Sequence, residues 1–303
     1  MTALVVSVFG AYYSVIPEGS KEIILATIKG KNRLQKLSKK ENPFAVGDLV
    51  TIDLLNDGNA VISDLLKRKN VIKRSSTTRT QVLGANIDQV IFVGAWKKPK
   101  INLGLFDRVI VEANCCDIPV SLIMNKKDLK VNQDLDTKLN VYRGIGIKVY
   151  SEALLSSVSS PLKKSLVNKR VLLLGESGSG KSTFLNAVAA KALQATGEVS
   201  RFDTGKHTTT NPVLHQLEIG AQVIDIPGFR EFGLAHRDSK DVINGFPEFF
   251  PLNCKFKDCL HVGEPGCEIT NKVEKYKIRY ESYKMILSSL NQLWKPRRGD
   301  SFN

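Results

Sequence analysis

The sequence predicts a multi-domain α/β protein with three parts: a small β-barrel (1–75), a doubly wound α/β domain (76–232) and a small α-rich C-terminal domain (233–303). Short β-type runs separated by turns fill the first part, which is typical of a barrel. Apolar strands alternate with helices in the second part, which is typical of a parallel sheet covered on both faces. A loop rich in Cys, Pro and Gly precedes a charged helical stretch in the third.

The first part is interpreted as an OB-like barrel. The strand-like runs are Val5–Val8, Glu22–Ile28 and Leu49–Leu54, and the segments between them are Pro17-Glu18-Gly19, the basic stretch Lys29–Lys40 and Asn56-Asp57-Gly58. A barrel with a long basic loop fits an oligonucleotide-binding module. A capping β-domain with a charged loop explains the same pattern, and the sequence leaves this choice open.

Charge and cysteine content limit the possible surroundings and partners. The chain has 44 Lys+Arg against 30 Asp+Glu, a formal net charge of +14, which favours a polyanionic partner. The apolar start (1–16) lacks the basic segment and cleavage site of a signal peptide, and we expect a strand there. No apolar run is long enough to span a membrane. The odd number of cysteines fits a reducing compartment, so we expect a cytoplasmic protein.

The second part contains five apolar runs that predict buried parallel strands: Gln89–Val93, Val120–Met124, Ile147–Tyr150, Val171–Leu174 and Val223–Ile226. Helical stretches lie between them, including Gly104–Asn114 and Ser182–Gln194. In such a domain, ligands bind at the carboxyl ends of the strands. The motifs described next all fall at those ends.

A complete phosphate-binding loop of the form G-x4-G-K-S follows the strand Val171–Leu174 and opens a helix. Its glycines let backbone N–H groups surround phosphates, and the helix N-terminus adds a favourable dipole. Lys181 is expected to reach the β- and γ-phosphates as a catalytic group, and the Ser182 hydroxyl to bind Mg²⁺. The expected phosphate-site residues are Gly175, Glu176, Ser177, Gly178, Ser179, Gly180, Lys181, Ser182 and Thr183.

Two further motifs extend this site. Asp225-Ile-Pro-Gly228 ends the strand Val223–Ile226, where a carboxylate can hold Mg²⁺ and the Gly228 amide can sense the γ-phosphate. Asn125-Lys126-Lys127-Asp128 ends the strand Val120–Met124. Its Asp can accept two hydrogen bonds from the N1 and N2 groups of guanine, a pattern that adenine cannot offer. Together the motifs predict a guanine-nucleotide site.

The order of the motifs is permuted. In ordinary GTPases N-K-x-D follows the phosphate loop, whereas here it precedes it. The fold class is therefore a circularly permuted P-loop GTPase domain, in which Ser151 is a candidate for the loop behind the guanine. Switch I must fall in residues 204–210, where Thr208 and Thr209 are candidates to close on Mg²⁺. Phe229 stands where Ras-like enzymes have a water-orienting Gln, so His207 is the nearest replacement, although a mobile or RNA-facing role explains it equally.

The third part holds a Cys₃His set within residues 254–267, namely Cys254, Cys259, His261 and Cys267. Thiolates and an imidazole in a tight loop suit tetrahedral structural zinc, with no open position for catalysis. The third part is too small for a large core, so such a cross-link would stabilise it. Cys115 and Cys116 lie at the end of a predicted helix and are interpreted as inert core residues.

These motifs together resemble the circularly permuted GTPases that assist small-subunit maturation in bacteria, the ribosome small subunit-dependent GTPase A family. The resemblance covers nearly the whole chain and includes Val46-Gly-Asp48, Arg74 and Ala85–Gln89. It implies an N-terminal OB barrel, a C-terminal zinc domain, binding to 30S particles and 16S rRNA, and slow GTP hydrolysis stimulated by the ribosome. Glu152 follows Ser151 where the family more usually has Ala, and switch I lacks a basic residue common there.

We therefore expect a GTP hydrolase that uses GTP/GDP with Mg²⁺ and one structural Zn²⁺, binds the 30S subunit and 16S rRNA, does not bind membranes and is a monomer. Two other readings remain. An ATP-driven P-loop enzyme would share the phosphate loop but leave Asn125–Asp128 unexplained. An RNA-binding module with a vestigial nucleotide site would not need the intact Lys181, Ser182 and Asp225.

Overall fold

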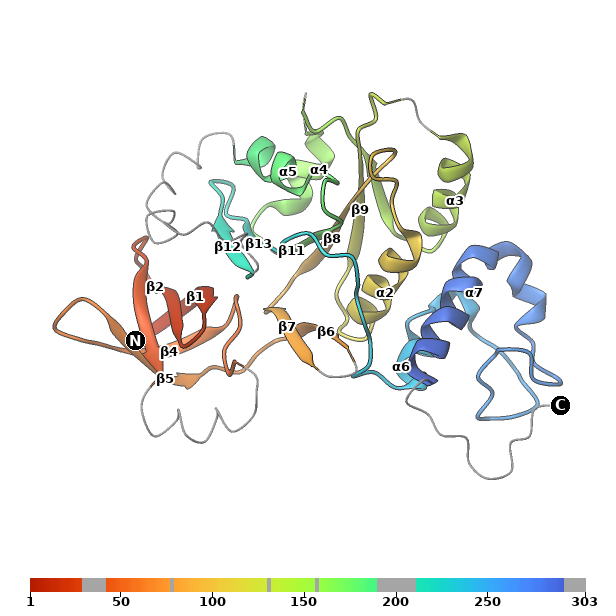
Figure 1. Cartoon of the computed structure of the whole chain (residues 1–303), viewed down its shortest axis with the longest axis horizontal. Coiled ribbons are helices and arrows are strands. Elements are labelled where there is room, and N and C mark those ends of the chain that lie inside the picture. The colour runs from red at the N-terminus through yellow and green to blue at the C-terminus, as the bar shows by residue number, and fades with distance from the viewer. Residues whose placement is uncertain (29–41, 77–78, 130–131, 156–157, 190–210, 292–303) are drawn as a thin grey trace.

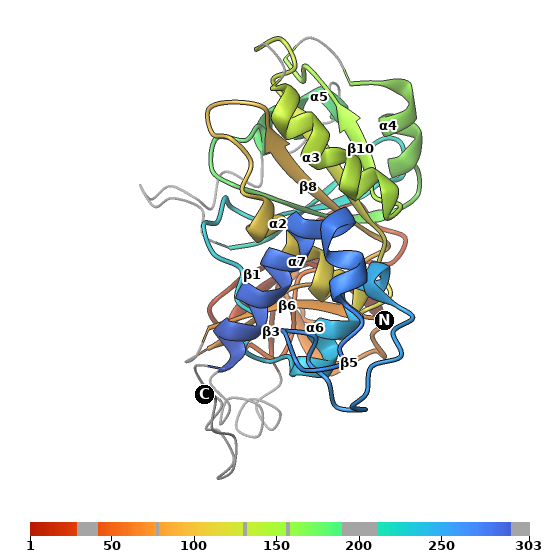
Figure 2. The same ribbon diagram turned by 90° about the vertical axis from the view of Figure 1, so that its right-hand side faces the viewer.

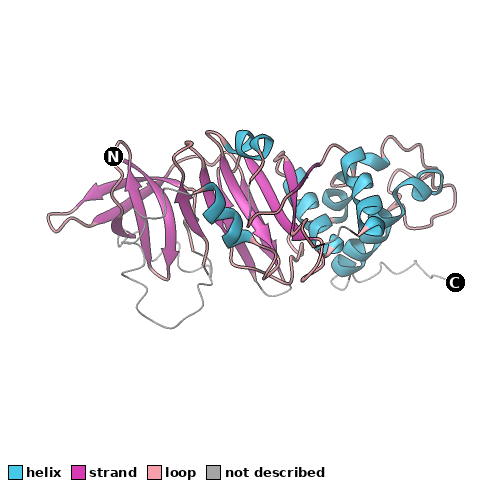
Figure 3. Ribbon diagram, turned by 90° about the horizontal axis from the view of Figure 1, so that it is seen from above, coloured by secondary structure: helices cyan, strands magenta, loops and turns pink. Residues whose placement is uncertain are grey.

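The computed structural model describes residues 1–28, 42–76, 79–129, 132–155, 158–189 and 211–291. A strand-rich part, a mixed α/β part and a helical part follow one another along the long axis of the molecule (Figure 3). The basic stretch Lys29–Lys40 and residues 190–194 of the predicted helix Ser182–Gln194 lie outside the described residues. Within the described ranges, every helix is too short or too polar to cross a membrane.

The N-terminal part is a closed five-stranded barrel, as predicted. Its strands are β1 (Thr2–Phe9), β2 (Tyr12–Pro17), β3 (Ile24–Ile28), β4 (Leu49–Leu54) and β5 (Ala60–Leu65). They pair in the order β1-β2-β3-β5-β4, and β4 pairs back to β1 to close the barrel. Alternate side chains point inward, among them Val5, Val15 and Ile62, because successive residues of a strand face opposite sides.

The central part is a sheet with helices on both faces. Its strands are β8 (Gln89–Ala95), β9 (Val120–Asn125), β10 (Lys148–Ser151), β11 (Arg170–Gly175) and β13 (Gln222–Asp225), which are parallel in the order β10-β9-β8-β11-β13. Helices α2 (Leu103–Asn114) and α3 (Gln133–Gly144) share one hydrophobic core with it, and α4 (Ser160–Leu166) and α5 (Lys181–Val188) share the other. This arrangement confirms the predicted doubly wound domain.

One strand that the sequence did not reveal joins the barrel to the sheet. β12 (Val213–Gln216) is antiparallel to β13 and contacts β1 through the pair Ser7 and Val213, so a single eleven-stranded sheet runs through both parts (Figure 1). A separate hairpin of β6 (Val71–Ser75) and β7 (Thr80–Ala85) crosses the predicted boundary at residue 75. The three-domain boundaries themselves stay a prediction.

The C-terminal part consists of α6 (Ser239–Asn244), a short 3-10 helix η3 (Pro247–Phe249), an irregular loop and α7 (Thr270–Asn291). α7 packs across α2 and beside α3 (Figure 2). Arg279 of α7 is fully buried and forms ion pairs with Asp107 of α2, 2.5 Å away, and with Glu248 of η3, 2.7 Å away. Burial lowers the pKa of Arg279, but the two carboxylates outweigh this effect and raise it, which keeps the guanidinium charged.

The ion pair between α2 and α7 gives a stability prediction. Asp107→Ala should lower the free energy of unfolding by about 3–5 kcal/mol, because it leaves a buried guanidinium without one of its two partners. Urea unfolding curves measure the change. Asp136→Ala is the matched control, since it breaks an exposed pair with Arg143 and should cost about 0–1 kcal/mol. Equal shifts for both variants would show that the buried pair does not hold α7 in place.

Candidate functional site

Each predicted nucleotide motif within the described residues begins at the end of a strand of the parallel sheet. Asn125 ends β9, Ser151 ends β10, Gly175 ends β11 and Asp225 ends β13. Because these strands are parallel neighbours, with β8 between β9 and β11, their carboxyl ends form one edge of the sheet. The fold therefore brings the motifs together although their order along the chain is permuted.

The phosphate loop runs from the end of β11 to the start of α5. Gly175, Gly178 and Gly180 have positive φ angles of 149°, 76° and 109°, which L side chains rarely adopt. A Cβ on Gly175 would also collide with the carbonyl oxygen of Val93. The glycines are thus required for the loop to bend closely around its centre.

Lys181 is folded into this loop. Its side chain is 8% exposed, and Nζ donates to the carbonyl oxygens of Gly175 at 2.8 Å and Glu176 at 3.2 Å. Burial lowers the pKa of Lys181, and the nearby Asp225 and Glu176 oppose this shift. The exposed Ser182 and half-buried Thr183 follow in the first turn of α5. The ammonium group therefore lies where phosphate oxygens could replace the two carbonyl oxygens as its hydrogen-bond acceptors.

Asn125 links the guanine-reading motif to the phosphate loop. Its Nδ2 donates to the carbonyl oxygen of Ser179 at 3.0 Å, and its Oδ1 accepts from the backbone N–H groups of Lys126 and Leu154. Lys126 reaches across the same loop, donating to the carbonyl oxygens of Gly178 at 3.0 Å and of Lys98. Asn125 is thereby a structural bridge as well as a candidate ligand.

The end of the site that is predicted to bind guanine is open. Lys127 and Asp128 are exposed, and within the described residues Asp128 has no hydrogen-bond or ion-pair partner. The Lys127 N–H donates to the Glu152 carbonyl oxygen at 3.1 Å, which holds the loop after Ser151 beside the motif. The Glu152 side chain instead accepts from the backbone and hydroxyl of Ser159. Glu152 is therefore used to shape this loop rather than to face a base.

Asp225 and Gly228 lie close to the phosphate loop: the Asp225 carboxylate acts on the pKa of Lys181, and Gly228 packs against Ser177. One carboxylate oxygen of Asp225 is buried without a hydrogen-bond partner in the described structure. An orphaned buried carboxylate oxygen beside a phosphate loop fits a Mg²⁺ site, because Mg²⁺ prefers oxygen ligands. Gly228 lies so close to Ser177 that a Cβ on it would approach the Ser177 Cα within 2.7 Å. Residues 226–233, here called the switch II segment, thus begin in contact with the phosphate loop.

The environment of Asp225 gives a second prediction. Burial raises the pKa of its carboxyl, opposed by Lys181 and His215. A carboxyl group whose pKa is raised on folding favours the folded state when it is protonated. This contribution to the free energy of unfolding is complete below the ordinary pKa of 3.8 and is lost as the pH rises through the raised pKa. Asp225→Asn should therefore raise the melting temperature of the nucleotide-free protein at neutral pH but not at acidic pH. It should also weaken Mg²⁺-dependent GTP binding by about 10–100-fold.

Calorimetric scans across pH and nucleotide titrations with and without Mg²⁺ test the role of Asp225. Asp64→Asn is the control, since Asp64 is an exposed carboxylate of the barrel. An unchanged Mg²⁺ dependence in Asp225→Asn would remove Asp225 from the metal site. Of the other predicted site residues, His207, Thr208 and Thr209 lie outside the described residues, so their roles stay predictions.

The four residues predicted to bind zinc come together in the C-terminal part. The donor atoms of Cys254, Cys259, His261 and Cys267 all lie within 4.8 Å of one another. Cys254 Sγ is 3.4 Å from His261 Nδ1 and 3.8 Å from Cys267 Sγ, and Cys267 Sγ is 3.5 Å from the same nitrogen. A tetrahedral zinc site with Zn–S bonds of about 2.3 Å has edges of about 3.5–3.8 Å, so the cluster fits this metal.

Neighbouring groups fix the loop that carries this cluster. The Glu264 carboxylate accepts from the backbone N–H groups of Leu260 and Val262 at 2.8 Å. Tyr280 and Tyr283 of α7 donate to the carbonyl oxygens of His261 and Leu260. The cluster is thus tied to the same helix that carries Arg279, and through it to α2.

A set of contacts that no sequence motif predicts, here called the junction, lies behind the switch II segment. Ser75 pairs with Leu234, and its hydroxyl lies 2.7 Å from His236 Nδ1. His236 Nε2 lies 3.0 Å from the buried carboxylate of Glu112, which also accepts from Arg237 at 2.7 Å. The chain leaving switch II is therefore attached to both β6 and α2. These residues share no local motif, so no sequence signal could identify their contact.

Comparisons with known proteins agree with this geometry. The family model for the RsgA GTPase matches residues 65–235. The small ribosomal subunit biogenesis GTPase RsgA of Phocaeicola vulgatus is 36% identical over 301 residues, covering 95% of this chain and 96% of that protein. The RsgA of Flavobacterium psychrophilum is 33% identical and covers 100% of this chain and 96% of its own length.

Two solved structures are similar to this one. The crystal structure of YjeQ from Thermotoga maritima has a TM-score of 0.75 and 29% identity, covering 97% of this chain and 99% of that one. YloQ, described as a circularly permuted GTPase, has a TM-score of 0.67 and 24% identity over 98% of this chain and 96% of its own, a likeness of fold. By its family-model match and its full-length relatives, the chain belongs to the RsgA GTPase family.

Proposed function

We propose that this GTPase acts in the late assembly of the small ribosomal subunit. It binds the 30S particle and its 16S rRNA and hydrolyses GTP to GDP and phosphate faster when bound. The observation that carries the nucleotide part is the meeting of Asn125, the phosphate loop and Asp225 at one edge of the sheet. The names of the curated relatives and the net charge of +14 support the ribosomal part.

In this proposal the phosphate loop holds the nucleotide through its backbone N–H groups. Lys181 leaves the carbonyl oxygens of Gly175 and Glu176 and binds the β- and γ-phosphates. Ser182 and Asp225 would hold Mg²⁺, which would neutralise charge that develops on the phosphates during transfer. The full set of proposed phosphate ligands is Gly175, Glu176, Ser177, Gly178, Ser179, Gly180, Lys181, Ser182 and Thr183.

The remaining proposed roles concern the base, the attacking water and the switch. Asp128 reads guanine, with Asn125, Lys126, Lys127 and Ser151 around the ring. Thr208 or Thr209 closes on the Mg²⁺ shell in the GTP state, and His207 orients the attacking water. Phe229 stands at the position of the usual Gln, is 5% exposed and packs against Phe232. Because its side chain cannot orient a water, another residue is needed for this role.

The metal, the domain division, the location and the oligomeric state also belong to this proposal. Cys254, Cys259, His261 and Cys267 bind one structural Zn²⁺, supported by their mutual distances. The chain divides at residues 75 and 232 into an OB-fold RNA-binding domain, a permuted GTPase domain and a zinc domain. The protein is a cytoplasmic monomer without a membrane partner, and a reducing compartment is supported by its five cysteines, an odd number that form no disulfide in the described residues.

Binding to purified 30S subunits tests the proposed function. Co-sedimentation should retain more protein with a non-hydrolysable GTP analogue than with GDP, because a switch protein has different affinity in its two states. The single-turnover rate of GTP hydrolysis should rise when 30S subunits are added. If 30S binding is the same with the GTP analogue and with GDP, and if added 30S subunits do not raise the hydrolysis rate, the proposal of a ribosome-linked switch is wrong.

Base selection gives a third prediction. Asp128→Ala should reduce the preference for GTP over ATP by about 100-fold or more, because it removes two hydrogen bonds to a charged acceptor, each contributing about 1.5–3 kcal/mol. Competition binding with both nucleotides measures the ratio. Asp134→Ala is the control, since it removes an exposed carboxylate at the start of α3. Equal use of ATP and GTP by the wild type would instead favour the ATP-driven alternative.

A further inference from the structure

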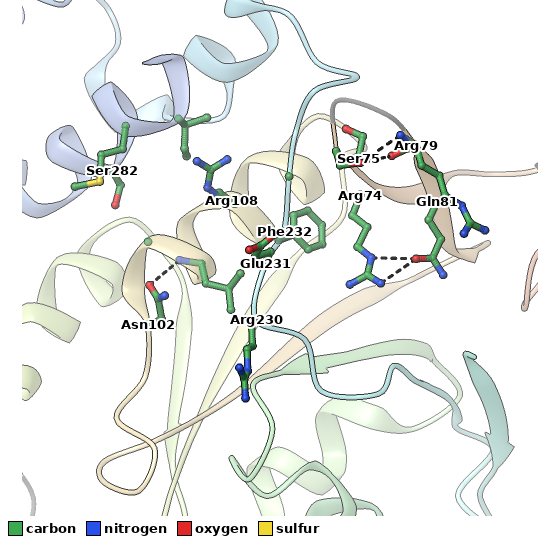
Figure 4. A pocket seen from close by; sticks show the side chains of 16 residues that line it. Arg74, Ser75, Arg79, Gln81, Asn102, Arg108, Arg230, Glu231, Phe232 and Ser282 are labelled. Atoms are coloured by element: carbon green, nitrogen blue, oxygen red, sulfur yellow. Dashed lines mark hydrogen bonds between the residues drawn. The ribbon is translucent and has the colours of Figure 1, made fainter. Parts of the chain in front are cut away.

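A pocket of about 750 Å³ lies outside the nucleotide site, where four segments meet (Figure 4). The β6–β7 hairpin, the start of α2, the end of the switch II segment and α7 each supply part of its lining. Ligand sites commonly occur where separate structural units meet. None of the nucleotide or zinc motifs contributes to this pocket.

Among the described residues, the pocket is lined by four arginines, Arg74, Arg79, Arg108 and Arg230, and by one carboxylate, Glu231. Within the described residues, none of the four arginines forms an ion pair. Arg74 donates to the neutral Gln81 side chain at 3.0 and 2.9 Å, and Arg108 donates to the Ser289 hydroxyl at 3.1 Å. These contacts orient the guanidinium groups without neutralising them.

Two of these charges are also partly removed from water. Arg74 and Arg108 are half-buried, and burial lowers the pKa of both, with Arg79 adding to the effect on Arg74. A desolvated cation without a counter-charge is costly, and an anion that enters the pocket relieves this cost. The arrangement therefore favours an anionic ligand, and planar guanidinium groups suit phosphate in particular.

Part of the pocket lining is apolar. Leu105, Phe232 and Ile286 line it and are buried, while the neighbouring Met285 is 64% exposed. A free inorganic anion has no apolar surface that could pack against these side chains. A nucleotide of an RNA strand has both features, a phosphate for the arginines and a sugar and base for the apolar side chains.

The pocket is connected to the phosphate loop through a short stretch of chain. Gly228 packs against the phosphate loop at Ser177, and the pocket-lining Arg230 and Phe232 lie two and four residues further along the chain. Phe229 lies between them, with its ring 5.8 Å from the Arg74 guanidinium and 5.8 Å from the Phe232 ring. A movement of switch II on loss of the γ-phosphate would therefore displace pocket-lining side chains.

We infer that this pocket binds a phosphate-bearing segment of an RNA strand, and that switch II makes its affinity depend on the bound nucleotide. The inference rests on the proposed function, since it specifies where a GTP-dependent RNA contact forms. Binding energies are reciprocal, so RNA in the pocket would change GTP affinity by the same factor. RNA binding in the pocket and nucleotide binding at the phosphate loop would thus be thermodynamically coupled.

The experiment measures binding of the full chain to a labelled single-stranded RNA oligonucleotide by fluorescence anisotropy, over a range of salt concentrations. Arg108→Gln and Arg230→Gln should each weaken binding by about 5–10-fold and reduce the slope of log affinity against log salt by about 1. Arg143→Gln, which removes an exposed arginine paired with Asp136, should change neither. Arg230 is exposed, so its variant should fold even if Arg108→Gln does not.

The nucleotide dependence is measured with the same oligonucleotide. Wild-type affinity should differ between a GTP analogue and GDP, and Arg230→Gln should reduce that difference. Unchanged affinity and salt slope in both variants, with intact wild-type RNA binding, would overturn the pocket but leave the proposed function standing. Calorimetric titration with inorganic phosphate tests whether the pocket binds a free anion instead. Phosphate binding as tight as that of the oligonucleotide would assign the pocket to a free anion and overturn the inference.

Discussion

Lys181→Ala is expected to lower the single-turnover rate of GTP hydrolysis by about 10²–10³-fold, on the scale of removing one preorganised charged donor from a transition state. Lys181 is buried in the phosphate loop, where its Nζ donates to two backbone carbonyl oxygens. Phosphates entering the loop would exchange these neutral acceptors for charged ones, which form stronger hydrogen bonds. Because charge shifts as the γ-phosphoryl group leaves, the benefit should appear in the rate as well as in binding.

Lys163→Ala is the matched control for Lys181→Ala, because Lys163 is an exposed lysine on α4. Rates should be measured with enzyme in excess over GTP, with and without 30S subunits. The far-ultraviolet circular dichroism of both variants should match that of the wild type. A rate for Lys181→Ala within a few-fold of the wild type would contradict the catalytic role and favour a binding module with a vestigial site.

Much of the nucleotide site could be predicted from the sequence because its chemistry is local. The glycines of the phosphate loop, Lys181 and Ser182 lie in one short stretch whose backbone geometry depends on those residues themselves. Asn125 and Asp225 could be placed because apolar strands of limited length precede them, and a parallel sheet aligns its carboxyl ends. The permuted order did not weaken this reasoning, since the sheet order and not the chain order decides which motifs meet.

The connections between the three parts could not be predicted, because they depend on residues far apart in the chain. The β1–β12 pairing joins residues 7 and 213, and a short strand at a sheet edge leaves little pattern in the sequence. Arg279 looked like one more charge on a charged helix, yet it is fully buried between Asp107 and Glu248. Its burial follows from how α7 docks on α2, which no local signal encodes.

The permuted order has a structural consequence behind the nucleotide site. After switch II the chain is attached to β6 and α2 through Ser75, His236 and Glu112, and then enters α6. Burial raises the pKa of Glu112, but His236 and Arg237 outweigh this effect and lower it, so the junction is held by a charged carboxylate. A γ-phosphate-dependent movement would therefore meet a fixed point before the zinc cluster. Truncation of the C-terminal part that left nucleotide-dependent 30S affinity unchanged would count against this coupling.

Loss of the zinc ligands should have the largest effect on structure. Cys254→Ser should abolish metal binding and unfold the loop of residues 252–267, because the apparent binding free energy of structural zinc is about 10–16 kcal/mol. That value is comparable with the entire stability of a typical domain, about 5–15 kcal/mol. The loop has few other supports within the described residues, chiefly Glu264 and the two tyrosines of α7.

Metal analysis should find about one zinc per wild-type chain and none in Cys254→Ser, and hydrogen exchange should rise sharply across the loop. Cys116→Ser is the control, because Cys116 lies outside the cluster and its thiol donates to the Val71 carbonyl oxygen, a bond that a hydroxyl can replace. GTP affinity should be retained in both variants, since the phosphate loop is held by β11, α5 and Asn125. Full zinc content in Cys254→Ser would contradict the role of Cys254 as a required ligand. Unchanged exchange despite lost zinc would mean that protein contacts alone hold the loop. Retained GTP binding together with lost 30S binding would instead show that the zinc loop serves the partner and not the nucleotide.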